Sequence, residues 1–161
     1  MTTQTWIIWG VSAVAGIALG GFILTRTQWF KIRKYAIDMK KVYDNHKDLQ
    51  SKVENAQQVA QNPHVNAVLR NRALNDVIEE QKKLIADIEK VKAPTSATEL
   101  HSDTLALQRE TLDFYVKGRA GGFGQKALNE KQKKLMTMSS ALEAKMEKVY
   151  GPMKKPTDKK K

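Results

Sequence analysis

The chain has 161 residues, of which 41% are hydrophobic and 28% charged, and its formal net charge is +11. This size suits one modest domain with appendages rather than a multidomain enzyme. Because the chain contains no cysteine, a disulfide, an iron–sulfur cluster, a thiolate zinc site and a thiol nucleophile are all excluded. Leu, Ile, Val, Ala, Lys, Glu and Gln dominate after residue 30, and this composition predicts an all-α fold.

The opening stretch predicts a membrane anchor. Residues 6–25 are twenty consecutive uncharged, mostly apolar residues, and as a helix they would cover about 30 Å, the thickness of a bilayer's hydrocarbon core. Trp6 and Trp9 lie at one end and Trp29 just past the other, as expected for rings at headgroup depth. Residues 1–5 lack the Lys or Arg that opens a secretion signal. We predict an uncleaved transmembrane helix over 6–25, with a cleaved signal or a buried core helix as alternatives.

The flanking charge predicts which way the anchor faces. Arg26, Lys31, Arg33 and Lys34 follow the predicted span, whereas no Lys or Arg precedes it. Because basic flanks stay in the cytoplasm, we expect a single-pass protein of the cell membrane with residues 1–5 outside and the body in the cytoplasm. In a mitochondrion or plastid the same rule would place the body in the matrix or stroma, but the amino end does not resemble an Arg-rich transit peptide.

Small residues form a ridge within the predicted span. Ser12, Gly16 and Gly20 recur every four residues, a spacing that lets a second transmembrane helix approach closely. This ridge predicts packing against another membrane subunit or a second copy of the chain. Since Gly and Ala are common in membrane helices, the alternative is a ridge without a partner.

A long helix is predicted over residues 28–61. Its apolar residues are separated by alternating steps of three and four, which is typical of a heptad seam. Either the chain's own later helices or another chain would cover this seam. His46 is its one titratable member; we predict a partly buried residue that fixes register, with a pH switch or a metal ligand as alternatives. The seam comprises Ile32, Tyr35, Met39, Val42, His46, Leu49 and Val53, continued by Ala56 and Ala60.

Two prolines divide the remaining body into further helices. Pro63 disfavours a helical Asn62 and suits a first helical turn, so we predict a turn and a second helix over 63–92, with a kinked continuous helix as the alternative. One face of this helix is apolar, and we expect the opposite face to be charged and solvated. The apolar face holds Leu74, Val77, Ile78, Leu84, Ile85, Ile88 and Val91.

Two more helices complete the predicted body, which we expect to be a helical bundle or coiled coil of four amphipathic helices. Pro94 ends the second helix, and Ser96 with Glu99 has the spacing of a capping box, which predicts a third helix over 97–117. A fourth helix is predicted over 125–150, where Leu128, Leu135, Leu142 and Val149 recur every seven residues. It stops at Gly151, and residues 151–161 are predicted to be a disordered basic tail.

The sequence holds no fingerprint of catalysis. The glycine loop at 118–124 joins two helices and is followed by QKALNE, so it lacks the strand and the Lys-Ser/Thr of a phosphate-binding loop. His64 and His101 have no partner at metal-ligand spacing. We therefore predict no enzyme activity, no cofactor and no metal site.

The charge distribution favours a membrane surface over nucleic acid. Residues 42–150 hold 17 basic and 15 acidic side chains, so the excess lies beside the predicted span and in the tail. A near-neutral body disfavours the alternative of nucleic-acid binding. If the helices alternate in direction, both basic clusters would face anionic lipid headgroups; the alternative is a solvated tail. The residues expected at the membrane surface are Arg26, Lys31, Arg33, Lys34, Lys154, Lys155, Lys159, Lys160 and Lys161.

Taken as a sequence, the chain predicts a membrane-anchored helical scaffold or adaptor, or an accessory subunit of a membrane assembly. It would hold other subunits or copies of itself through helix–helix contacts at the cytoplasmic face. The second hypothesis is a membrane-tethered module that binds nucleic acid or anionic lipid.

Overall fold

The computed structural model describes residues 28–62, 64–120 and 125–150, and all of the regular structure in these ranges is helical, which confirms the all-α prediction there. None of the helices in the described ranges is both long and apolar enough to cross a bilayer. The predicted span with Ser12, Gly16, Gly20 and Arg26 lies outside these ranges, as does the tail with its five lysines. The elements are α2 (Gln28–Asn45), α3 (Asp48–Gln61), α4 (Ala67–Lys90), the 3₁₀ turn η1 (Thr95–Ala97), α5 (Thr98–Arg119) and α6 (Gln125–Tyr150).

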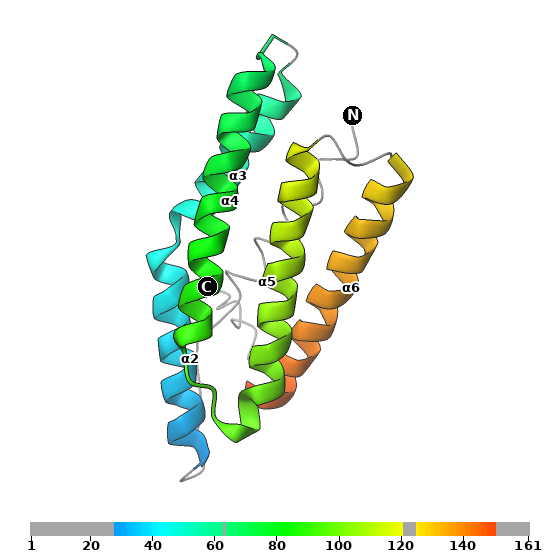
Figure 1. The fold of residues 1–161 in the computed structure, drawn as a ribbon. Coiled ribbons are helices and arrows are strands. Elements are labelled where there is room, and N and C mark those ends of the chain that lie inside the picture. Colours follow the sequence, from blue (N-terminus) through cyan, green and yellow to red (C-terminus); the bar gives the residue numbers. More distant parts are fainter. Residues whose placement is uncertain (1–27, 63, 121–124, 151–161) are drawn as a thin grey trace, which may run out of the picture.

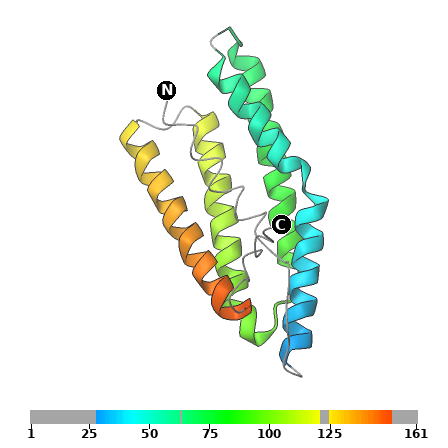
Figure 2. The ribbon, with the colours of Figure 1, turned by 180° about the vertical axis from the view of Figure 1, so that it is seen from behind.

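The helices pack side by side as a bundle with α4 and α5 at its centre (Figure 1). The successive helices α2 and α3 run along one side of α4, α5 packs on α4, and α6 packs on α5. Figure 2 shows that α2 begins, and α6 ends, at the same end of the bundle. The hairpin of α3 and α4 extends past α5 and α6 at the other end.

Two apolar clusters form the core along the length of α4. The first joins α2 to α4, α5 and α6 and includes Met39, Leu84, Ile88, Leu107 and Leu142. The second lies toward the hairpin and joins α3 to α4 and Tyr115 of α5; its other buried members are Val53, Ala56, Ala73, Val77 and Ile78. Burial of an aliphatic side chain contributes roughly 1.5–3 kcal/mol, so these clusters account for most of what favours the bundle.

The predicted single helix over 28–61 is wrong, because two turn residues, His46 and Lys47, separate α2 from α3. The His46 N–H donates to the Tyr43 carbonyl at 3.1 Å, and the Leu49 N–H donates to the His46 carbonyl at 2.9 Å. These three-residue steps are 3₁₀ bonds, which tighten the chain locally. No proline or glycine occurs at the break, and His46 there contacts two carboxylates of α4.

The second predicted helix begins four residues later than expected and ends two residues earlier. The expected turn between helices is present, with Asn62 in an extended conformation after α3. Asn66 caps α4, and its side-chain oxygen accepts a hydrogen bond from the Leu69 N–H at 2.9 Å. Asparagine satisfies an otherwise unpaired donor at this position, so Asn66 rather than Pro63 determines where α4 begins.

The predicted capping box at Ser96 and Glu99 is also wrong. Ser96 lies within the 3₁₀ turn η1, and Ala97, which precedes α5, makes no side-chain capping bond. Glu99 instead accepts a hydrogen bond from Lys145 of α6 at 2.6 Å. The 3₁₀ turn supplies the local backbone bonds here: the Ala97 N–H donates to the Pro94 carbonyl at 2.8 Å.

Candidate functional site

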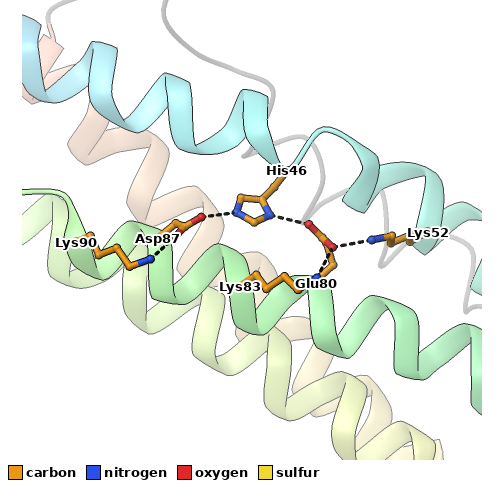
Figure 3. A network of polar contacts seen from close by, with 6 residues as sticks. All are labelled: His46, Lys52, Glu80, Lys83, Asp87 and Lys90. Carbon is orange, nitrogen blue, oxygen red and sulfur yellow. Dashed lines mark hydrogen bonds and ion pairs between the residues drawn. The ribbon is translucent and has the colours of Figure 1, made fainter.

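A buried histidine lies between two carboxylates at the break between α2 and α3 (Figure 3). His46 Nδ1 is 2.7 Å from Glu80 Oε1, and its Nε2 is 2.9 Å from Asp87 Oδ2. The two acidic residues are seven apart on α4, so they lie two turns apart on one face of that helix. His46 is 8% exposed. The break therefore places an imidazole against α4 where an ideal helix would carry an apolar seam residue.

Lysines occupy the carboxylate oxygens that His46 does not use. Lys52 Nζ lies 2.6 Å from Glu80 Oε2, with Lys83 Nζ at 3.8 Å from the same oxygen. Lys90 Nζ lies 2.7 Å from Asp87 Oδ1. Each of the four carboxylate oxygens thus faces a nitrogen of His46 or of a lysine. We call this set of side chains the histidine network; it comprises His46, Lys52, Glu80, Lys83, Asp87 and Lys90.

Both ring nitrogens of His46 lie within hydrogen-bond distance of a carboxylate oxygen, and both carboxylates also accept from a lysine. Hydrogen bonds from Lys52 and then His46 lower the pKa of Glu80 to about 2. Hydrogen bonds from Lys90 and His46 likewise lower the pKa of Asp87. The network is an ion-paired joint between α2, α3 and α4.

Acid should weaken this joint in a defined pH window. Because the folded-state pKa of Glu80 is depressed, its stabilising contribution is present above the unfolded value of 4.5 and is lost as pH falls toward about 2. We expect the free energy of unfolding to fall by on the order of 2 kcal/mol over this window. Urea unfolding of the full chain in mild detergent, repeated from pH 5 to about 2, measures it. The Glu80→Gln variant should show a flatter profile, and an equally steep one would contradict the assignment.

A second polar contact lies in the core between α4 and α5. Gln81 and Gln108 are each 2% exposed, and Gln81 Nε2 donates to Gln108 Oε1 at 2.6 Å. Burial raises the pKa of Tyr43 to about 12, against the opposing effect of its side-chain hydrogen bond with Gln108. Because an unpaired buried amide costs desolvation, this contact favours the observed alignment of α4 and α5.

The predicted heptad seam is covered within the chain. Tyr35, Met39, Val42, His46 and Val53 are buried, Ile32 and Leu49 are half-buried, and Ala60 is exposed. Their neighbours in the two core clusters come from α4, α5 and α6. Of the two alternatives that the sequence allowed, the internal bundle is the one observed.

His46 is the seam residue whose role exceeds the predicted one. It is buried and fixes the helices by bonding to both carboxylates rather than by acting as a spacer. Across the described ranges, no group of three or more His, Asp or Glu side chains is arranged to hold a metal ion. Nδ1 of His101 lies 3.2 Å from the hydroxyl oxygen of Tyr35. Burial lowers the pKa of His101. His64 is exposed.

A lysine-lined groove of about 660 Å³ lies beside the histidine network. One wall is a stripe along α2, and the other is the end of α4 with the segment that follows it. Asp87 belongs to both the groove and the network, so the two sites adjoin. The residues of this lysine groove are Lys31, Lys34, Tyr35, Asp38, Val42, Asn45, Asp87, Lys90, Val91, Lys92, Ala93 and Pro94.

The lysine groove joins predicted and unpredicted residues. Lys31 and Lys34 were expected at the membrane surface and lie in the groove, whereas Arg33 does not line it. Lys90 and Lys92 come from a part of the chain distant in sequence, so no local pattern linked them to α2.

The sequence did not identify Glu80 as a site residue, because the charged residues of α4 were expected in solvent. Packing on two sides of α4 leaves Glu80 8% exposed. The one sequence signal for its burial is that Glu80 lies three residues after Val77, on the apolar face of α4.

Comparisons with known proteins add no assignment: the sequence matches no family model and is not significantly similar to any curated protein or solved structure.

Proposed function

We propose that this protein is a membrane-anchored helical scaffold, or an accessory subunit of a membrane assembly. The single observation that carries the proposal is the position of the two described ends. The start of α2, which follows the uncharged stretch 6–25 by three positions, and the end of α6, which precedes the basic tail, lie at one end of the bundle (Figure 2). Tyr150 and Tyr35 of α2 belong to the same core cluster. A span and a polybasic segment at one end fit attachment to one membrane surface.

The far end of the bundle supplies the surface for partners in this proposal. The α3–α4 hairpin projects there, and Val68 and Leu69 in the first turn of α4 are 73% and 50% exposed. Large exposed aliphatic side chains next to each other favour contact with another protein. Since the α2–α3 seam is buried inside the chain, the hairpin end replaces the seam as the proposed contact surface.

Anchoring and sidedness can be tested together in the full chain. The chain has no cysteine, so the single variants Thr3→Cys and Ser51→Cys each carry one reactive thiol. We expect the protein to stay in membranes during alkaline carbonate extraction. A membrane-impermeant maleimide should label Thr3→Cys in intact cells and Ser51→Cys after permeabilisation. Release by carbonate, or the reverse labelling, would contradict the proposal.

The scaffold part is tested by affinity purification from gently solubilised membranes. Wild type is compared with the Val68→Asp/Leu69→Asp variant, and the matched control is Asn71→Asp/Asn75→Asp, which carries the same charge change at exposed positions of α4. A membrane subunit that copurifies with wild type and the control but not with the hairpin variant is the expected result. Identical recovery with all three proteins would remove the hairpin from the proposal.

A further inference from the structure

The lysine groove carries an excess of positive charge that the carboxylates of the described residues do not neutralise. Four lysines line it against two aspartates. Lys90 is paired with Asp87, but among the described residues no carboxylate lies within ion-pair distance of Lys31, Lys34 or Lys92. Bringing like charges together from two segments costs free energy unless an anion joins them. The groove therefore has the chemistry of an anion site.

Part of the lining of the lysine groove is apolar, and this part is called its floor. Val42 and Tyr35 of α2 are buried there, and Val91, Ala93 and Pro94 of the segment after α4 are half-buried. A ligand that fills this groove would carry a negative group for the lysines and a less polar part for the floor. A glycerophospholipid headgroup has both, because its phosphate joins directly to a glycerol ester region.

We propose that the lysine groove binds the phosphate of an anionic phospholipid headgroup at the membrane surface. This inference rests on the proposed function, which places the start of α2 beside the bilayer. Lys31 and Lys34 are six and nine residues beyond position 25 in the sequence. In the proposed arrangement both lysines therefore lie near the membrane surface, where their long side chains extend toward the headgroups, and Lys92 lines the same groove from the segment after α4.

A nucleic acid is the less suitable occupant of this groove. Single-stranded nucleic acids are held by aromatic side chains on which bases stack, in addition to phosphate contacts. The only aromatic residue among those that line the groove is Tyr35, which is 2% exposed and bonded to His101. The groove thus offers cations and aliphatic surface without a stacking platform.

The test measures binding of soluble headgroup ligands by the full chain in a neutral, nonionic detergent. The probe is dihexanoyl phosphatidylglycerol below its micellar concentration, titrated by calorimetry. We expect Lys34→Glu/Lys92→Glu to bind about tenfold more weakly than wild type, or worse, since each basic residue contributes on the order of 1 kcal/mol. Lys34→Arg/Lys92→Arg should retain binding, and circular dichroism establishes that each variant is folded.

A matched charge reversal separates the groove from overall electrostatics. Lys126 and Lys133 are exposed on the first half of α6, away from the groove, and Lys126→Glu/Lys133→Glu makes the same change in net charge. We expect this control to bind within about twofold of wild type at 0.15 M salt, where surface charges are screened beyond about 8 Å. Equal losses in both double variants would overturn the groove as the site.

Further ligands decide the source of the anion. Dihexanoyl phosphatidylcholine should not bind measurably, and inorganic phosphate should bind more weakly than phosphatidylglycerol. Inorganic phosphate of equal affinity, or a single-stranded oligonucleotide that binds more tightly and depends on Lys34 and Lys92, would overturn the lipid assignment. Carbonate extraction tests the proposed function separately. Release by carbonate together with headgroup binding would contradict the membrane anchor but support the groove as a binding site. Retention in the membrane without headgroup binding would contradict only the headgroup inference.

Discussion

Replacing Leu107 with alanine should lower the free energy of unfolding by about 3 kcal/mol, within the 2–5 kcal/mol range of such truncations. Leu107 is 1% exposed and lies on α5 in the cluster that joins α2, α4, α5 and α6. Removing its three terminal carbon atoms leaves a cavity that rigid helices on several sides cannot close completely. The measurement is urea unfolding of the full chain in mild detergent, followed by circular dichroism.

Leu69→Ala is the matched control for this truncation. It removes the same atoms from a side chain that is 50% exposed, so water already contacts much of what is lost. We expect a change within about 0.5–1 kcal/mol. If both variants lost the same stability, the central position of Leu107 in the core would be contradicted.

Glu80→Ala should destabilise the protein to a similar extent, with an expected loss of about 3 kcal/mol in the free energy of unfolding. The carboxylate accepts from His46 at 2.7 Å and from Lys52 at 2.6 Å, and His46 is buried. Without Glu80, Nδ1 of the buried ring loses its carboxylate partner and Lys52 loses its ion pair. Unfolding at pH 7 under the same conditions measures the effect.

The neighbouring residue provides the control for Glu80. Glu79 also forms an ion pair, with Lys82 at 2.8 Å, but both side chains are more than half exposed. Such surface pairs contribute about 0–1 kcal/mol, so Glu79→Ala should change stability little. The double variant His46→Leu/Glu80→Leu is informative too, because removing both buried polar partners should recover part of the loss seen in Glu80→Ala. No recovery would indicate that the network is not the source of the cost.

The histidine network illustrates what local patterns miss. The heptad spacing identified His46 as a seam residue, and the structure places it there, buried against α4. The pattern did not identify its acceptors, because Glu80 and Asp87 are 34 and 41 positions away along the chain. The pattern also did not predict the break at His46 and Lys47, the position where these long-range bonds are made.

Helix boundaries show the same division between local and distant causes. The fourth predicted helix, 125–150, has the observed bounds. The start of α4 was misplaced because two local signals competed, Pro63 as a first-turn residue and Asn66 as a cap. The expected capping box is absent because Ser96 lies within η1 rather than directly before α5, and Glu99 bonds to Lys145, 46 positions away.

The sequence by itself determined the helical class, most of the apolar positions that are buried, and the turns after α3 and after α4, because hydrophobic periodicity and turn residues act over a few neighbouring positions. Only the tertiary structure decided which surface covers the α2–α3 seam, where Glu80 and Asp87 meet His46, and that Lys92 joins Lys31 and Lys34 in one groove. These outcomes depend on how the helices align against one another. That alignment is set by the packing of all their buried side chains together, including the polar pair Gln81 and Gln108, and no single segment specifies it.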